Sequence, residues 1–398
     1  MDITITHGCL SGNVTAIPSK SQAHRLLICA AFADSPTELI CPDTNRDIDA
    51  TVDCLNALGA DIRHTDDGYI IDPIAKIPTE ATLNCCESGS TLRFLLPIVG
   101  ALGAYTVFKM EGRLPQRPLS PLWEEMKRMG CKLRFISEDE LVCEGQLCPG
   151  DYYIDGGVSS QFITGLLFAT SLLEGDSTIH ITGNLESKPY VDMTRQAMKQ
   201  FGVYTDDFHI KGGQVYHSPS KLAVEGDWSN GAFWLSAKAL GSNIEVYNLD
   251  PNSSQGDRAA AQLIPALKEH ITISAADIPD LVPILSVVAA ANSGAVFTDI
   301  QRLRLKESDR VASTIAMLEA LGGKAEATED TLTVYPSPFI GGTVDAMNDH
   351  RIAMAAGIAA TCCTEPVTIL GAECVKKSYP KFWEEYARLG GNYELDLR

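Results

Sequence analysis

Residues 157–171 read G-V-S-S-Q-F-I-T-G-L-L-F-A-T-S, a small polar group followed directly by a long apolar run. Because short polar side chains cap helices, the stretch predicts a buried helix that begins near Ser159. The same pattern occurs six times, as P-S-K-S-Q-A-H-R at 18, E-S-G-S-T-L-R at 87, G-V-S-S-Q-F at 157, W-S-N-G-A-F at 228, I-P-D-L-V-P at 278 and M-N-D-H-R-I at 347. The marker residues Ser19, Ser88, Ser159, Ser229, Asp280 and Asp349 are separated by 69, 71, 70, 51 and 69 positions. This regularity indicates six copies of one structural unit.

Each unit is predicted to contain a helix, a strand, a second helix and two strands. Amphipathic second helices are expected at 47–58 and 309–321, and strands at 178–182, 331–336 and 368–370. Several second helices end in glycine, the usual residue after a helix C-terminus: Gly59, Gly130 and Gly202. The fourth unit is shorter by roughly twenty residues, so part of its strand pair is expected to be missing.

The predicted fold class is α/β. Six units are too many for one core, so three units in each of two domains fit the chain length of 398 residues. The division is expected near residues 222–225, directly after the Ser/Pro-rich stretch S-P-S-K at 218–221. An N-terminal strand at 3–6 precedes the first unit, and it could belong to either domain.

Composition narrows the possible partners. With 32 basic and 51 acidic residues the net charge is −19, which argues against nucleic acid or an anionic membrane as the main partner. Twelve cysteines without a C-x-x-C motif suggest buried free thiols in a reducing compartment. Neither a secretory signal nor an apolar run of about 20 residues is visible, so we expect a cytoplasmic protein.

Polar and basic residues gather where the six helices begin. Motifs for a P-loop, a Rossmann dinucleotide site, a zinc protease or a nucleophile elbow were not found. Helix N-termini carry free N–H groups and a positive dipole end, which suit phosphate and carboxylate groups. Each feature alone has a simpler explanation, because small polar residues cap helices and basic residues often lie on a solvated face. Their joint occurrence at equivalent points of a repeat favours an anion site, to which these cationic side chains would contribute: Lys20, Arg25, Arg93, Arg117, Lys306, Arg310, Arg351 and Lys377.

Six motifs in order resemble the 5-enolpyruvylshikimate-3-phosphate synthase family: S-K-S-x-A-H-R, V-S-S-Q-F, E-S-K-P-Y, K-E-S-D-R, N-D-H-R and C-V-K-K-S-Y-P. The resemblance extends from about residue 7 to the C-terminus. It implies a two-domain inverse α/β barrel with three units per domain, divided as 19–223 against 1–18 plus 224–398. It also implies transfer of the enolpyruvyl group of phosphoenolpyruvate to the 5-hydroxyl of shikimate 3-phosphate, with release of phosphate and without a metal or organic cofactor. The expected partners are these two small molecules, and we expect a monomer.

The resemblance also implies the site residues. Shikimate 3-phosphate would be bound by Lys20, Ser21, Arg25, Ser159, Ser160, Gln161, Ser187, Tyr190, Asp280 and Lys306. Phosphoenolpyruvate would be bound by Lys20, Gly89, Arg117, Gln161, Arg310, Arg351 and Lys377. The inhibitor glyphosate would compete at this second site, where Gly89 leaves space near the backbone.

The chemistry requires C3 of phosphoenolpyruvate to gain a proton while the 5-hydroxyl loses one. Glu307 is the candidate for the C3 proton and Asp280 for the hydroxyl proton. Lys20 and Lys377 would stabilise or protonate the leaving phosphate. Which of these four groups moves which proton stays open at this stage.

Two positions depart from the family pattern. E-S-G-S at 87–90 replaces the commoner N-A-G-T, and Arg302 stands where some members place an asparagine that contacts the shikimate.

Three rival functions can be weighed against this interpretation. A sister enzyme acting on UDP-N-acetylglucosamine carries a cysteine before an R-P dipeptide, and the loop at 111–118 has none. A non-catalytic sugar-phosphate sensor has no use for two carboxylates beside its ligand. An RNA-end-processing enzyme conflicts with the net charge.

Overall fold

The computed structural model describes residues 1–6 and 8–396. The chain forms two compact units, one made of Pro18–Val224 and the other of Met1–Ile17 together with Glu225–Arg398. The predicted divisions at 18/19 and 223/224 each differ from these by one residue.

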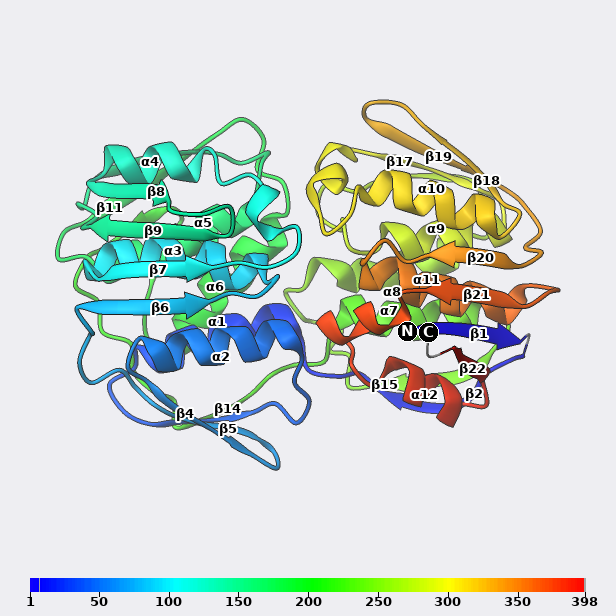
Figure 1. Cartoon of the computed structure of the whole chain (residues 1–398), viewed down its shortest axis with the longest axis horizontal. Coiled ribbons are helices and arrows are strands. Elements are labelled where there is room, and N and C mark those ends of the chain that lie inside the picture. The colour runs from blue at the N-terminus through cyan, green and yellow to red at the C-terminus, as the bar shows by residue number, and fades with distance from the viewer. Residues whose placement is uncertain (7, 397–398) are drawn as a thin grey trace. The chain divides into compact units, whose positions relative to one another are not determined.

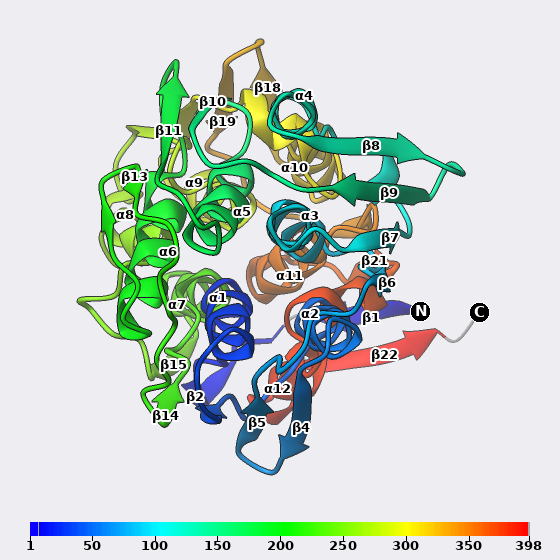
Figure 2. The same cartoon turned by 90° about the vertical axis from the view of Figure 1, so that its left-hand side faces the viewer.

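The unit Pro18–Val224 contains six α-helices among its described residues: α1 (Lys20–Ala31), α2 (Arg46–Ala57), α3 (Gly89–Leu102), α4 (Leu122–Arg128), α5 (Ser160–Ser171) and α6 (Lys188–Gln200). Its strands are β3 (Thr37–Ile40), β4 (Asp61–Thr65), β5 (Gly68–Asp72), β6 (Glu80–Asn84), β7 (Tyr105–Lys109), β8 (Cys131–Phe135), β9 (Glu140–Gly145), β10 (Asp151–Asp155), β11 (Ser177–Thr182), β12 (Thr205–Asp206), β13 (His209–Ile210) and β14 (Lys221–Ala223). They form three four-stranded sheets of the orders β14-β3-β5-β4, β6-β7-β9-β8 and β10-β11-β13-β12. The sheets lie around the helices of the unit (Figure 2).

All three sheets share one topology. The first two strands are parallel, as in β6 and β7, and an apolar helix connects them in the second and third sheets. An antiparallel hairpin such as β8–β9 then completes the sheet. The sequence does not predict the strand that precedes each apolar helix. This strand has only four or five residues and buries one or two of them, so its pattern is weak. The first sheet obtains this strand from β14, at the other end of the unit.

The second unit contains α7 (Trp228–Ala239), α8 (Ala260–Ala266), α9 (Val282–Ala291), α10 (Arg310–Ala320), α11 (His350–Ala359) and α12 (Phe382–Arg388). Its strands are β1 (Asp2–Thr6), β2 (Ser11–Thr15), β15 (Asn243–Tyr247), β16 (Ile271–Ser274), β17 (Ala295–Thr298), β18 (Lys324–Ala327), β19 (Thr331–Tyr335), β20 (Gly342–Asp345), β21 (Val367–Leu370) and β22 (Asn392–Asp396). The sheets have the orders β15-β2, β16-β17-β19-β18 and β20-β21-β1-β22 (Figure 1).

The N-terminal segment belongs to this second unit and supplies strands to two of its sheets. β1 pairs antiparallel with both β21 and β22, taking the place that β9 has in the second sheet. β2 pairs parallel with β15 in the shortened fourth repeat. After α8 the chain continues directly into β16, so this sheet has two described strands where the other five have four. The sequence predicts that part of the strand pair is missing; among the described residues both strands of the pair are absent from this sheet, and β2 pairs with β15.

The first helix of each repeat is buried on nearly all sides. In α3, α5 and α11 almost every residue is inaccessible to solvent, which is the property of a helix at the centre of a core. Most of the predicted caps are present: side chains of Ser19, Ser88, Ser159 and Asp349 accept hydrogen bonds from the first turns of their helices.

Two of the six markers are not caps. Asp227 caps α7 in place of Ser229, and Asp280 lies two residues before α9 without capping it. Three glycines after second helices have positive φ values, as the sequence predicts: Gly59, Gly130 and Gly202.

The position of β1 generates a stability prediction. Ile3 is fully buried between β21 and β22, so Ile3→Ala should lower the free energy of unfolding by about 2–5 kcal/mol. Ile70→Ala, on strand β5 with a 38% exposed side chain, should lower it by less than about 1 kcal/mol. Urea unfolding followed by circular dichroism measures both, and equal losses would contradict the place of β1 in this core.

Candidate active site

The predicted site residues fall into two groups, one in each unit. The first cluster lies in Pro18–Val224 and consists of Lys20, Ser21, Arg25, Gly89, Arg117, Ser159, Ser160, Gln161, Ser187 and Tyr190. The second cluster lies in the other unit and consists of Asp280, Lys306, Glu307, Arg310, Arg351 and Lys377.

The first cluster forms where α1, α3, α5 and α6 begin. Ser159 caps α5 and Ser160 is its first residue, both buried. Ser187 precedes α6 with φ of 55°, a left-handed conformation that is uncommon for serine and tends to occur at functional sites. Its carbonyl accepts a hydrogen bond from the Tyr190 amide, which fixes this turn.

Arg25 holds two of these helix starts together. Its guanidinium donates to the Ser21 carbonyl (2.5 Å) on α1 and to the Tyr190 carbonyl (3.0 Å) on α6. It also donates to the Thr194 hydroxyl (2.8 Å) and lies over the ring of Phe94. Burial lowers the pKa of Arg25 to about 10, so the side chain stays cationic at neutral pH.

Lys20 and Gln161 are held by residues that the sequence prediction left out of both sets. The Lys20 ammonium lies 2.8 Å from the Asp47 carboxylate at the start of α2. The Gln161 carbonyl oxygen accepts from Arg93 (2.7 Å), and its amide donates to the Ser90 hydroxyl (3.0 Å). Arg93 was noted as a cation at a helix start, but Asp47 looks in sequence like an ordinary acidic residue in a first helical turn.

Gly89 is in close contact with Arg117. A Cβ atom placed on Gly89 would lie 2.8 Å from the nearest guanidinium nitrogen of Arg117, so the absence of a side chain allows the arginine to approach the backbone. This refines the expectation that Gly89 leaves space for a ligand. The substituted Glu87 in the same loop points toward Gly112, where a Cβ would collide with its carboxylate.

The second cluster is organised by Arg310. This buried guanidinium donates to Asp280 (2.7 Å), Glu307 (2.6 Å) and Asp349 (3.0 Å), so it brings three carboxylates together. Glu307 precedes Arg310 by three residues, a spacing that would place the two on one face of a helix. It lies instead in the loop before α10, where the ion pair forms without a helix.

Asp280 is shared between two arginines. Its other carboxylate oxygen accepts from Arg351 at 3.1 Å. Burial raises the pKa of Asp280, but Arg351, Lys306 and Arg310 outweigh burial and hold the pKa well below its usual range. Asp280 is therefore ionised at neutral pH.

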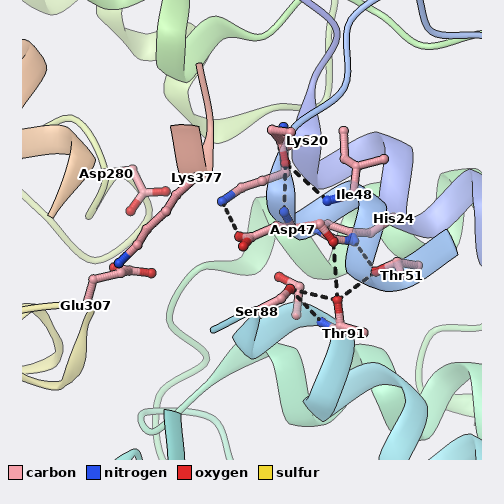
Figure 3. A network of polar contacts seen from close by, with 12 residues as sticks. Lys20, His24, Asp47, Ile48, Thr51, Ser88, Thr91, Asp280, Glu307 and Lys377 are labelled. Carbon is pink, nitrogen blue, oxygen red and sulfur yellow. Dashed lines mark hydrogen bonds and ion pairs between the residues drawn. The ribbon is translucent and has the colours of Figure 1, made fainter. Parts of the chain in front are cut away.

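Two lysines complete the second cluster. Burial lowers the pKa of Lys306 to about 8, although Asp280 opposes the shift, and the substituted Arg302 contributes to the lowering. Lys377 donates to the Asn348 carbonyl at 2.8 Å, and its ammonium points toward the side on which Asp280 and Glu307 lie (Figure 3). The second cluster thus places cationic side chains next to carboxylates. The cations could bind an anion, and the carboxylates could move a proton.

Buried Asp257 and Asp349 were not placed in either predicted set. Burial and the charge of Asp280 raise the pKa of Asp257 to about 7. In the described part of the chain, no group of three or more His, Cys, Asp or Glu side chains is arranged to hold a metal ion. No described helix is long and apolar enough to cross a bilayer.

Known proteins resemble this chain over its whole length. The profile of the family described as EPSP synthase (3-phosphoshikimate 1-carboxyvinyltransferase) matches residues 5–386. A 3-phosphoshikimate 1-carboxyvinyltransferase from Clostridium kluyveri is 39% identical, covering 99% of this chain and 98% of the relative. One from Clostridium acetobutylicum is 40% identical, covering 98% and 97%.

Solved structures share the fold. An EPSP synthase from Acinetobacter baumannii has a TM-score of 0.82 at 22% identity, covering 99% of this chain and 100% of that one. The enolpyruvyl transferase NikO from Streptomyces tendae has a TM-score of 0.76 at 17% identity, covering 99% and 98%. The predicted two-domain enolpyruvyl transferase fold is confirmed.

The contact between Gly89 and Arg117 predicts the effect of one added methyl group. Gly89→Ala should push the Arg117 guanidinium away from the backbone. If these two residues bind phosphoenolpyruvate, as the family resemblance implies, KM for it should rise about tenfold, as expected for one weakened charge-assisted hydrogen bond. Competition by glyphosate should weaken as well. Gly8→Ala is the control, because nothing lies within 4 Å of its added Cβ. Steady-state kinetics of both variants test this, and unchanged KM and inhibition in Gly89→Ala would refute it.

Proposed function

The chain belongs to the EPSP synthase (3-phosphoshikimate 1-carboxyvinyltransferase) family, and from that premise we propose which of its residues carry out the reaction. The enzyme transfers the enolpyruvyl group of phosphoenolpyruvate to the 5-hydroxyl of shikimate 3-phosphate and releases phosphate. One observation supports the assignment of roles most strongly: Arg310 holds the Asp280 and Glu307 carboxylates 2.7 and 2.6 Å from one guanidinium.

Binding of two anionic substrates requires cations that stay charged. We assign shikimate 3-phosphate to Lys20, Ser21, Arg25, Ser159, Ser160, Gln161, Ser187, Tyr190, Asp280 and Lys306. We assign phosphoenolpyruvate to Lys20, Gly89, Arg117, Gln161, Arg310, Arg351 and Lys377. The buried guanidinium of Arg25 and the helix starts around it support the first assignment, since such groups bind phosphate. The close approach of Arg117 to Gly89 supports the second.

The proton transfers divide between two carboxylates. In the addition step C3 of phosphoenolpyruvate gains a proton, C2 bonds to the 5-oxygen, and the hydroxyl proton is lost. In the elimination step C3 loses a proton and the bond from C2 to the phosphate oxygen breaks. We propose that Glu307 exchanges the C3 proton, because its carboxylate lies beside that of Asp280 on the same guanidinium and the low pKa of Asp280 makes Asp280 a weak base.

Asp280 has a different role in this proposal. A carboxylate whose pKa is held low is a weak base, but it is a strong hydrogen-bond acceptor. Asp280 therefore orients the 5-hydroxyl and receives its proton only as the carbon–oxygen bond forms. Lys20 and Lys377 stabilise the negative charge on the departing phosphate.

We also propose that the protein works as a cytoplasmic monomer without nucleic-acid or membrane partners. One chain supplies every assigned residue, so the site requires no second copy. All twelve cysteines are free thiols, which fits a reducing compartment. Sedimentation with and without both substrates tests the oligomeric state, and phosphate release that requires both substrates tests the reaction.

The lowered pKa of Lys306 predicts how binding depends on pH. Above about pH 8, Lys306 of the ligand-free protein loses its proton and its charge. The Kd for shikimate 3-phosphate should therefore rise about tenfold between pH 7.5 and 9.5. The ligand does not cause this change, because phosphate monoesters are fully ionised above pH 7. Lys306→Arg keeps its charge and should flatten the profile. Calorimetric titration measures both, and a flat profile for the unmodified protein would exclude the assignment.

Substitution of Glu307 separates chemistry from binding. Glu307→Gln can still accept from Arg310 but cannot take up a proton, so turnover should fall roughly 10²–10⁴-fold while shikimate 3-phosphate binding stays near normal. Glu319→Gln, an exposed change on α10, should leave both unchanged. Deuterium exchange at C3 of phosphoenolpyruvate, followed by NMR, tests the role directly. Exchange retained in Glu307→Gln would assign the proton to another group.

A further inference from the structure

Asp47 lies beside a proposed catalytic lysine without belonging to any predicted set. Its carboxylate is 2.8 Å from the Lys20 ammonium, and the two side chains are only 17% and 16% exposed (Figure 3). Lys20 is the first residue of α1, and Asp47 is the second residue of α2. We propose that Asp47 is a positioning residue, which holds the Lys20 ammonium in place for the leaving phosphate. This inference rests on the proposed role of Lys20.

Lys20 needs such a partner more than the arginines of the same cluster do. A lysine side chain has four flexible methylene groups, and fixing it opposes about 2 kcal/mol of rotamer entropy. Arg25 is held by carbonyls and a hydroxyl from two helices. The ion pair of Lys20 with Asp47 is largely shielded from water, so it confines the side chain better than an exposed pair would.

The backbone of Asp47 is itself fixed. The Asn45 side chain caps α2 by accepting hydrogen bonds from the amides of Asp47 (3.2 Å) and Ile48 (3.1 Å). The Asp47 carbonyl accepts a hydrogen bond from the hydroxyl of Thr91 on α3, at 3.4 Å. The carboxylate therefore projects from a helix start that contacts a second helix of the site.

A second contact between α1 and α2 lies one helical turn further along both helices than the ion pair. His24, four residues after Lys20, places Nδ1 2.7 Å from the hydroxyl of Thr51, four residues after Asp47. The Thr51 hydroxyl lies 2.7 Å from that of Thr91. The Thr91 hydroxyl in turn lies 2.7 Å from that of Ser88, the residue directly before Gly89 (Figure 3). Two side-chain contacts, Lys20–Asp47 and His24–Thr51, thus fix α1 against α2. Through Thr91 they also connect both helices to the start of α3.

The contact between His24 and Thr51 adds no charge to the cluster. His24 is fully buried, and desolvation together with Lys20 and Arg25 holds its pKa well below the usual range. The imidazole is therefore neutral at physiological pH, and its contact with Thr51 is a hydrogen bond between uncharged groups. Asp47 is therefore the anionic residue in these two contacts between α1 and α2, and its carboxylate faces Lys20.

The kinetic signature of a positioning carboxylate differs from that of a binding residue. Asp47→Asn removes a negative charge close to cations that bind anions, so it should leave KM for phosphoenolpyruvate unchanged or lower it. It also releases the Lys20 side chain, and we expect kcat to fall about 10- to 100-fold, as for a catalytic group displaced by roughly 1 Å. Asp47→Glu restores the carboxylate and should recover part of kcat.

A double-mutant cycle with Lys20→Gln tests the proposal. If Asp47 acts through Lys20, Asp47→Asn should lower kcat in the unmodified enzyme but have little further effect in the Lys20→Gln background. Asp49→Asn, an exposed change two residues further along α2, is the matched control and should leave kcat unchanged. Thermal unfolding of each variant, with titration of the active fraction, corrects kcat for any loss of folded enzyme.

The outcomes separate the two proposals. If Lys20→Gln turns over like the unmodified enzyme, the proposed role of Lys20 fails, and the positioning role of Asp47 fails with it. If Lys20→Gln is slow and Asp47→Asn lowers kcat equally in both backgrounds, only the positioning role is overturned. A rise in KM for phosphoenolpyruvate with unchanged kcat in Asp47→Asn would also overturn it.

Discussion

Cations that bind one anionic ligand lie close together, so they repel one another, and burial removes their hydration. Each cation therefore needs a nearby hydrogen-bond acceptor that offsets both costs. Arg310 meets this requirement with three carboxylates, and Lys20 meets it with Asp47. Removing one partner of a buried pair typically costs about 3–5 kcal/mol, because the remaining charge stays desolvated. In each cluster the acidic residues therefore stabilise the cations that we assign to substrate binding, so a net charge of −19 is compatible with the proposed binding of anions.

The repeat supplies the geometry that this requirement needs. Each apolar helix is buried, so its polar residues collect at its start, where side chains can reach the free N–H groups of the first turn. Within one unit, contacts such as Gln161 with Arg93 and Thr91 with Asp47 join the starts of different helices. Capping and the proposed ligand binding therefore use the same or adjacent positions: Ser159 caps α5 and is also assigned to shikimate 3-phosphate, and Ser88 caps α3 next to the assigned Gly89.

The sequence was informative about the repeat and much less so about contacts between repeats. Periodic apolar runs and glycine stops predicted the long helices, and family motifs predicted the residues of both clusters. Short strands such as β6 and β16 bury too few residues to be recognised. Asp47 and Asp349 each look like a first-turn acid or a cap, because their partners Lys20 and Arg310 lie 27 and 39 residues away. Such pairings depend on the register between helices, which spacing along one helix does not reveal.

The same distance effect governs how the sheets are completed. The strand that opens the first sheet, β14, follows β3 by more than 180 residues, and the Thr4 hydroxyl of β1 contacts that of Thr368 across 364 residues. One sheet of the first unit and two sheets of the second unit therefore form only after distant parts of the chain have come together. Contacts this distant in sequence delay folding, because loop closure must precede the pairing that stabilises it. The local repeats can form early, whereas the sheets containing β1, β2 and β14 must be among the last to complete.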